Sequence, residues 1–212
     1  MKRFSFSTPL LLAAWLLVGC QDTPGDQPVL DQASTPAAVQ ANAPVSDLSI
    51  YNLESDWTTQ VGKEIKLDAF KGKPLLVSMV YTSCAFACPR TVADLQIIEK
   101  GLADYQTNDF HVVLVTIDPA RDTTARLQAF AAENNLNLNR WTLLTSTSDN
   151  IQELAAILNV KYRKALNGEF AHSNLITLLN AQGEIVHQQQ GLGASPEETL
   201  TKMKELLPPV QK

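Results

Sequence analysis

An apolar strand pattern runs into a helical pattern across two cysteines, and this junction restricts the chain to folds in which a strand end and a helix start share one site. The mostly apolar residues 74–80 precede Cys84 and Cys88, and Pro89 suits a first helical turn because it has no N–H to leave unpaired. A three-residue gap at such a turn lets both sulfurs face one small volume, and the N–H groups of a helix start favour thiolate. The pair predicts a reversible disulfide or a soft-metal site.

Strand and helix patterns alternate through residues 47–212. We expect strands at 75–81, 110–118 and 141–144, followed by a closing hairpin of 175–179 with 184–189. Apolar residues at helical spacing follow Pro89 and Asp122 and recur through 151–158 and 200–207. This order is typical of an α/β fold, a thioredoxin-like three-layer sandwich, with a two-stranded N-terminal hairpin added ahead of Pro74.

Sites in open α/β sheets form at the carboxyl ends of strands, where Cys84 and Asp118 both fall. The pair Asp118-Pro119 is also a turn signal, so a structural role for this aspartate stays open. We expect Arg121 and Asp122 to pair with each other and Asp122 to cap the next helix, without a role in chemistry.

The N-terminus has the pattern of a secretory signal. Lys2 and Arg3 precede an apolar stretch too short for the roughly 20 residues of a membrane-spanning helix. Residues 17–20, Leu-Val-Gly-Cys, resemble a bacterial lipobox, in which Cys20 becomes the first mature residue and carries lipid; the alternative is an ordinary signal in which Cys20 is coincidental. We therefore interpret residues 1–20 as a lipoprotein signal peptide ending in the lipobox cysteine, and expect a lipid-anchored protein of the bacterial cell envelope with its domain in the periplasm or on the extracytoplasmic face.

Cleavage would remove Lys2 and Arg3 from the 17 basic residues and leave all 22 acidic ones, for a net charge near −7. Such a charge argues against a nucleic-acid partner. Residues 21–46, rich in Pro, Ala, Gln and Asp, are interpreted as a flexible tether, and residues 47–212 as the domain. With Cys20 lipidated, only Cys84 and Cys88 remain, and in an oxidising compartment they would form a disulfide unless a periplasmic thiol reductant or a bound metal protects them.

Four signatures occur in a fixed order between about Gly72 and Gly191. They are Gly-Lys-x-Leu-Leu from Gly72, Tyr-Thr-x-Cys-x-x-x-Cys-Pro from Tyr81, Asp-Pro-x-Arg-Asp-Thr from Asp118, and His172-Ser173 ahead of the last hairpin. Together they resemble the SCO/SenC family of thioredoxin-like copper-binding proteins. The resemblance implies membrane-anchored delivery of copper to the CuA centre of cytochrome c oxidase, or reduction of its cysteines, with Cys84, Cys88 and His172 as metal ligands.

The implied ligand set is chemically coherent. Two thiolates and one imidazole suit Cu(I), which accepts three ligands and leaves an approach open for transfer, whereas a structural zinc site would normally have four protein ligands. Asp118 could orient His172 or accept a proton from a thiol. His111 and His187 are interpreted as structural or exposed.

The sequence departs from the family pattern near both kinds of ligand. Ala171 stands where the family usually has an aspartate before the histidine, and Ala85-Phe86 stand where Pro-Asp is common. We therefore expect fewer polar groups around the ligands. Phe86 has two open interpretations, an apolar docking residue or an aromatic side chain folded into the core.

Three classes of function remain. The first is a metallochaperone that carries copper, as Cu(I) or in a Cu(II)-thiolate form. The second is a thiol-disulfide oxidoreductase that acts through the cysteine pair alone, and the third is a peroxiredoxin-like peroxidase, disfavoured because the residues before Cys84 differ from that family's pattern. The recipient could be the CuA-bearing subunit of a respiratory oxidase, nitrous oxide reductase or another copper protein.

Overall fold

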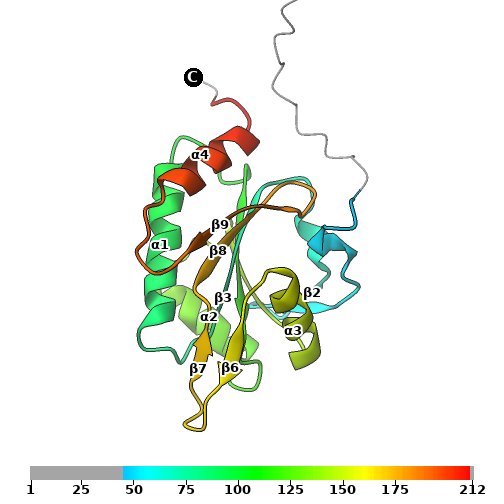
Figure 1. Ribbon diagram of the computed structural model, residues 1–212, viewed down its shortest axis with the longest axis vertical. Coiled ribbons are helices and arrows are strands. Elements are labelled where there is room, and N and C mark those ends of the chain that lie inside the picture. The colour runs from blue at the N-terminus through cyan, green and yellow to red at the C-terminus, as the bar shows by residue number, and fades with distance from the viewer. Residues whose placement is uncertain (1–44, 211–212) are drawn as a thin grey trace, which may run out of the picture. The chain divides into compact units, whose positions relative to one another are not determined.

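A seven-stranded mixed sheet runs through the part of the chain that the computed structural model describes, residues 45–210 (Figure 1). Its strand order is β2-β1-β5-β4-β3-β8-β9, and a separate two-stranded sheet pairs β6 with β7. The strands are β1 (Trp57–Thr59), β2 (Glu64–Ile65), β3 (Leu75–Val80), β4 (His111–Thr116), β5 (Trp141–Thr145), β6 (Tyr162–Lys164), β7 (Phe170–His172), β8 (Leu175–Leu179) and β9 (Ile185–Gln190). The helices are α1 (Ala87–Gly101), α2 (Thr124–Glu133), α3 (Ser148–Ile157) and α4 (Glu197–Leu206), with short 3-10 turns η1 (Ile50–Asn52) and η2 (Leu67–Phe70).

The central strands β3, β4 and β5 are parallel, and all six residues of β3 are buried. Right-handed connections from β3 to β4 and from β4 to β5 step the same way along the sheet, which places α1 and α2 on one face. A hydrogen bond of 2.9 Å from Gln96 of α1 to the carbonyl oxygen of Asn134 after α2 agrees with this. Figure 1 shows α4 beside α1, with α3 on the other side of the sheet, so the predicted three-layer α/β arrangement is confirmed.

The ends of the sheet are antiparallel. The expected N-terminal hairpin is β1 with β2, and β1 pairs antiparallel with β5. The expected closing hairpin is β8 with β9, and β8 pairs antiparallel with β3. Because β3 lies between β4 and β8, its carboxyl end is in the interior of the sheet and the residues that follow it are held from both sides.

The predicted helix cap at Asp122 is wrong. Thr123 caps α2, where its side chain accepts a hydrogen bond of 3.3 Å from the N–H of Arg126. Asp122 is instead fully buried. Its carboxylate accepts hydrogen bonds from Thr116 of β4 and from the backbone N–H of Thr82 in the cysteine loop. Its expected partner Arg121 pairs with Asp118.

The hairpin of β6 with β7 was not predicted, although it carries His172 on its second strand. Its turn contains Asn167-Gly168, and Gly168 has a φ of +83° that a side chain would strain. An Asn-Gly pair between two short β-type runs is a strong hairpin signal that could have identified it. His172 was expected to lie ahead of the last hairpin, outside any strand. In the structure it is the last residue of β7.

The proposed signal peptide, including Cys20, and residues 21–44 of the proposed tether lie outside the described residues. Within residues 45–210, none of the helices has the length and apolar character needed to cross a membrane. At the start of this range, Val45 packs against the core and the Ser46 hydroxyl hydrogen-bonds to Glu184. The described contacts of the domain thus include two residues of the proposed tether, Val45 and Ser46.

Candidate metal centre

Cys84, Cys88 and His172 converge at the carboxyl end of β3. One ligand atom from each lies within 4.8 Å of the others, and both cysteines are free. The Sγ atom of Cys88 lies 3.8 Å from Nε2 of His172. The structure thus brings together two cysteines of one strand-to-helix junction and a histidine that follows Cys88 by 84 positions.

The start of α1 positions the two sulfurs. Its first helical residue is Ala87, so the N–H of Cys88 has no partner inside the helix. That N–H points to Sγ of Cys84 at 3.4 Å, and the N–H of Tyr81 points to Sγ of Cys88 at the same distance, 3.4 Å. Each sulfur therefore accepts a backbone hydrogen bond, as expected for a strand-to-helix junction.

The two thiols differ in acidity. Burial by itself would raise the pKa of the Cys84 thiol, but the N–H groups of Cys88 and Phe86, together with hydrogen bonds involving the Cys88 and Tyr81 side chains, bring the net pKa below its usual value. Burial strongly raises the pKa of the Cys88 thiol, and the nearby charge of Cys84 adds to the rise. Cys84 is also the more exposed of the two, so it is the sulfur that ionises first and meets a partner first.

His172 presents Nε2 to the cysteines because its other ring nitrogen is occupied. Nδ1 lies 3.0 Å from the carbonyl oxygen of Ser173, which can only accept, so Nδ1 carries the hydrogen and Nε2 has a free lone pair. Burial lowers the pKa of His172, although the Ser173 carbonyl acts in the opposite direction. The ring is therefore neutral near pH 7, as a metal ligand must be.

An aromatic wall holds the histidine from one side. The ring of Tyr81 meets that of His172 nearly edge-on, with centroids 6.0 Å apart, and packs on Phe170 at 5.3 Å. The Tyr81 hydroxyl donates a hydrogen bond of 2.8 Å to the carboxylate of Glu169. Burial raises the pKa of Tyr81, and this hydrogen bond raises it further, so the phenol keeps its proton. Sequence reasoning did not assign these residues to the site, because two of them lie on the unpredicted hairpin.

Asp118 lies at the end of β4 but has other partners than His172. Its buried carboxylate pairs with Arg121 and, at 3.9 Å, with the ammonium group of Lys164. One role considered for Asp118 was to orient His172. In the structure the carbonyl of Ser173 contacts the ring nitrogen instead. A backbone carbonyl can do this whichever side chain stands at Ala171, so the missing aspartate does not leave the ring unsupported.

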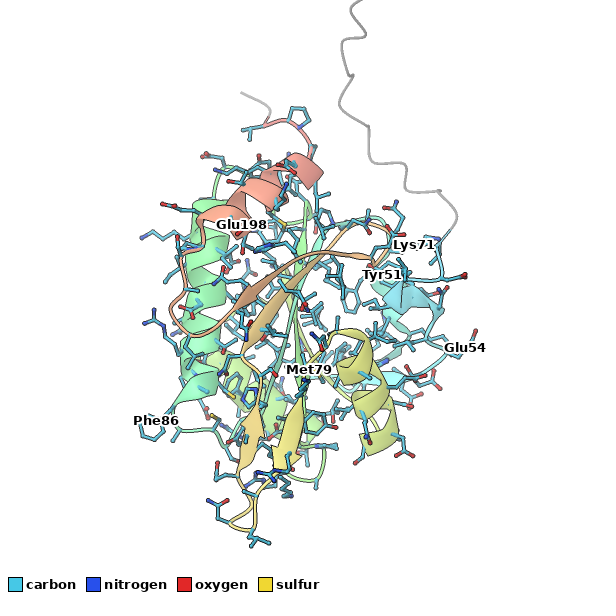
Figure 2. The ribbon with its side chains drawn as sticks, viewed as in Figure 1. Tyr51, Glu54, Lys71, Met79, Phe86 and Glu198 are labelled. Carbon is cyan, nitrogen blue, oxygen red and sulfur yellow. The ribbon has the colours of Figure 1, made fainter. Side chains whose placement is uncertain are left out.

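The side chain of Phe86 is not folded into the core. It is 87 % exposed and projects outward at the start of α1 (Figure 2). His111 and His187 lie outside the cluster, as expected. Nδ1 of His111 is 3.2 Å from the carbonyl oxygen of Arg140, and Nδ1 of His187 is 3.7 Å from the carboxylate of Glu198.

Comparisons of sequence and of structure with known proteins point to the same family. The sequence pattern of the SCO1/SenC family matches residues 50–208. A SCO1 protein homolog of Bacillus subtilis (strain 168) is 26 % identical over 144 residues, which cover 66 % of this chain and 74 % of that protein.

Solved structures resemble the chain over most of their length. A SCO1/SenC family lipoprotein from Bacillus anthracis str. Ames superposes with a TM-score of 0.66 and 25 % identity, covering 74 % of this chain and 95 % of its own. ScoI of Bradyrhizobium japonicum, solved with copper bound, superposes with a TM-score of 0.62 and 24 % identity, covering 72 % and 97 %. The latter likeness concerns the fold.

Proposed function

The chain belongs to the SCO1/SenC family, and we propose that it binds copper through Cys84, Cys88 and His172 and transfers the ion to a partner protein. The observation that carries this proposal is the convergence of two sulfurs and one imidazole nitrogen within 4.8 Å. A solved relative, the Bradyrhizobium ScoI, has copper bound, which adds support.

The donor set fits Cu(I) better than it fits other metals. Thiolate sulfur and imidazole nitrogen are ligands for this soft ion, and three of them leave one side open for a receiving ligand. Among residues 45–210 the cluster includes no further histidine, cysteine or carboxylate, so a four-ligand zinc site is not available from this group. Because Nε2 of His172 is unprotonated, only the two thiols need to lose protons when the metal binds.

The partners and the location are part of the proposal. We propose that a lipid on Cys20 anchors the protein in the bacterial cell envelope and that residues 47–212 act in the periplasm or on the extracytoplasmic face. The recipient would be a CuA-type centre of a respiratory oxidase or another copper protein, and a periplasmic thiol reductant would keep the cysteines reduced between cycles.

Copper retention by ligand variants tests the proposal. The reduced protein loaded with Cu(I) should keep one copper per chain during dialysis against a moderate chelator. We expect His172→Ala to weaken binding by orders of magnitude and to change the charge-transfer absorption of any Cu(II)-thiolate form, and Cys84→Ser or Cys88→Ser to abolish binding. His187→Ala is the matched control, since that histidine lies on β9 outside the cluster. Wild-type affinity in His172→Ala would contradict the ligand assignment.

A second candidate function rests on the difference between the two thiols. A partly exposed cysteine with a lowered pKa beside a buried one with a raised pKa is the arrangement of an attacking and a resolving cysteine. If the wild-type protein binds copper no better than an unstructured dithiol while exchanging disulfides rapidly, thiol-disulfide oxidoreduction replaces copper transfer as the main activity.

A further inference from the structure

The hairpin that carries His172 has an excess of basic residues, although the whole chain has a formal net charge of −5. Residues 161–172, which include both strands of the β6–β7 hairpin, contain three basic residues and one acidic residue. The basic residues, Lys161, Arg163 and Lys164, are all exposed. The acidic one, Glu169, is hydrogen-bonded to Tyr81. Positive charge is therefore concentrated on the element that carries His172.

Further cations join the hairpin from the neighbouring loops. Arg121 donates a hydrogen bond of 2.9 Å to the carbonyl oxygen of Gly168 in the hairpin turn. Arg121 and Lys164 share one buried carboxylate, that of Asp118, and the carboxylates of Glu169 and Asp122 also act on Arg121. The excess of positive charge therefore comes from Lys161 and Arg163 of the hairpin. Arg121 and Lys164 remain partly exposed, with 38 % and 51 % of their side-chain surfaces accessible. We call Arg121, Lys161, Arg163 and Lys164 the basic rim.

Two apolar side chains project from the same ligand-bearing elements. Phe86 lies between the two cysteines in the chain and is 87 % exposed, and Leu166 at the tip of the β6–β7 hairpin is fully exposed, at 110 %. Neither has a packing role that would explain its size. Figure 2 shows Phe86 pointing away from the protein at the end where the hairpin also projects.

We propose that the basic rim, with Phe86 and Leu166, is the docking surface for a protein whose own cysteine-containing site is bordered by aspartates and glutamates. This inference rests on the proposed function and specifies its partner by chemistry. Arginine and aromatic residues are typical of interface centres, and opposed charges accelerate association and exclude partners of the wrong sign. An acidic partner is selected because a partner with a basic border would meet the like charge of the hairpin that carries His172.

Disulfide exchange with synthetic peptides gives a direct measurement of this preference. The thiolate of Cys84 attacks one sulfur of the peptide disulfide, the peptide S–S bond breaks, and one peptide sulfur leaves as a thiolate that takes up a proton. Cys88 then loses its proton and attacks the Cys84 sulfur, which forms the Cys84–Cys88 disulfide and releases the second peptide thiol. The protein dithiol loses two electrons and the peptide disulfide gains them.

The test compares two peptides with the same internal disulfide and the same leucines beside it, one flanked by glutamates and the other by lysines. With the reduced wild-type protein at low salt, we expect the acidic peptide to react at least about 10-fold faster, and added salt to reduce this ratio. Arg163→Glu should lower the ratio several-fold. Lys71→Glu makes the same change of charge at the residue after η2, far from Phe86 in Figure 2, and should leave the ratio nearly unchanged.

Leu166→Ser separates the apolar contribution from the charge. This variant should slow exchange with both peptides to a similar extent and leave their ratio intact, because the leucines are common to both. Equal rates of the two peptides with the wild-type protein, or equal effects of Arg163→Glu and Lys71→Glu, would overturn the proposal. Copper retention is measured on the same proteins. Loss of copper by the wild type would contradict the proposed copper function, but the ratio of the two peptide rates would still test the docking surface.

Discussion

The carboxylate of Asp122 accepts a hydrogen bond of 3.0 Å from the backbone N–H of Thr82, two residues before Cys84. The same carboxylate accepts the Thr82 hydroxyl at 2.6 Å and the hydroxyl of Thr116, at the end of β4, at 2.5 Å. A single buried group thus ties the cysteine loop to the neighbouring strand. Arg126 adds a hydrogen bond of 3.0 Å to the Thr82 hydroxyl, which fixes this loop from the α2 side.

Asp122→Asn should therefore destabilise the domain and loosen the site. The amide keeps only one acceptor oxygen for three donors, and an unsatisfied buried donor costs about 1–3 kcal/mol. Urea denaturation of the two proteins measures this loss. Asp104→Asn, an exposed position beyond α1, is the matched control and should change stability by less than about 0.5 kcal/mol. Equal stability of Asp122→Asn and the wild type would show that the loop is held by other contacts.

The thiols should react in order with iodoacetamide. Because its pKa lies below the usual value, Cys84 is a thiolate at lower pH than an ordinary cysteine, and its alkylation rate should level off at a correspondingly lower pH. Cys88 has no exposed surface and a raised pKa, so it should be protected until the protein unfolds. Peptide mapping by mass spectrometry after a short pulse at several pH values distinguishes the two sites. Comparable labelling of both in the folded protein would contradict the assigned difference.

A chain shortened to begin at Val45 should unfold in one cooperative transition. The described contacts of the N-terminus start at Val45 and Ser46, and residues 21–44 have too little apolar surface to offset the entropy of ordering. Starting at Asp47 instead should cost about 1 kcal/mol, because the Ser46 contacts with Glu184 and Asn52 are lost. Thermal unfolding of both chains beside the full-length protein makes the comparison. A lower transition temperature for the chain that starts at Val45 would mean that earlier residues pack on the domain.

Cys20→Ala should prevent lipidation without affecting the domain. If residues 17–20 are a lipobox, the variant cannot accept a lipid on sulfur and should be found uncleaved or released from the membrane. Labelling with a radioactive fatty acid, followed by membrane fractionation, measures this. The folded domain should keep its wild-type copper stoichiometry, which serves as the control for folding. Fatty-acid labelling of Cys20→Ala equal to wild type would rule out this cysteine as the anchor.

Local patterns in the sequence predicted most of the fold. The buried run that became β3, the helix start at the cysteine pair and the closing hairpin were all expected, because each depends on residues within a few positions of one another. The hairpin of β6 with β7 was missed: its strands have only three residues each, and their alternation is too short to stand out without attention to Asn167-Gly168.

The sequence by itself determined that Cys84 and Cys88 would face one volume, since three residues at a helix start leave few other arrangements. Only the tertiary structure decided the rest of the site. The pairing of β6 with β7 brings His172 to the sulfurs, and burial separates the acidities of the two thiols. The carbonyl of Ser173 orients the ring, which was one of the roles considered for Asp118. Asp122 likewise holds the cysteine loop against the sheet, because Thr82 of that loop and Thr116 at the end of β4 both donate hydrogen bonds to its buried carboxylate. Such contacts depend on strand order and depth in the sheet, which neighbouring residues in a chain do not specify.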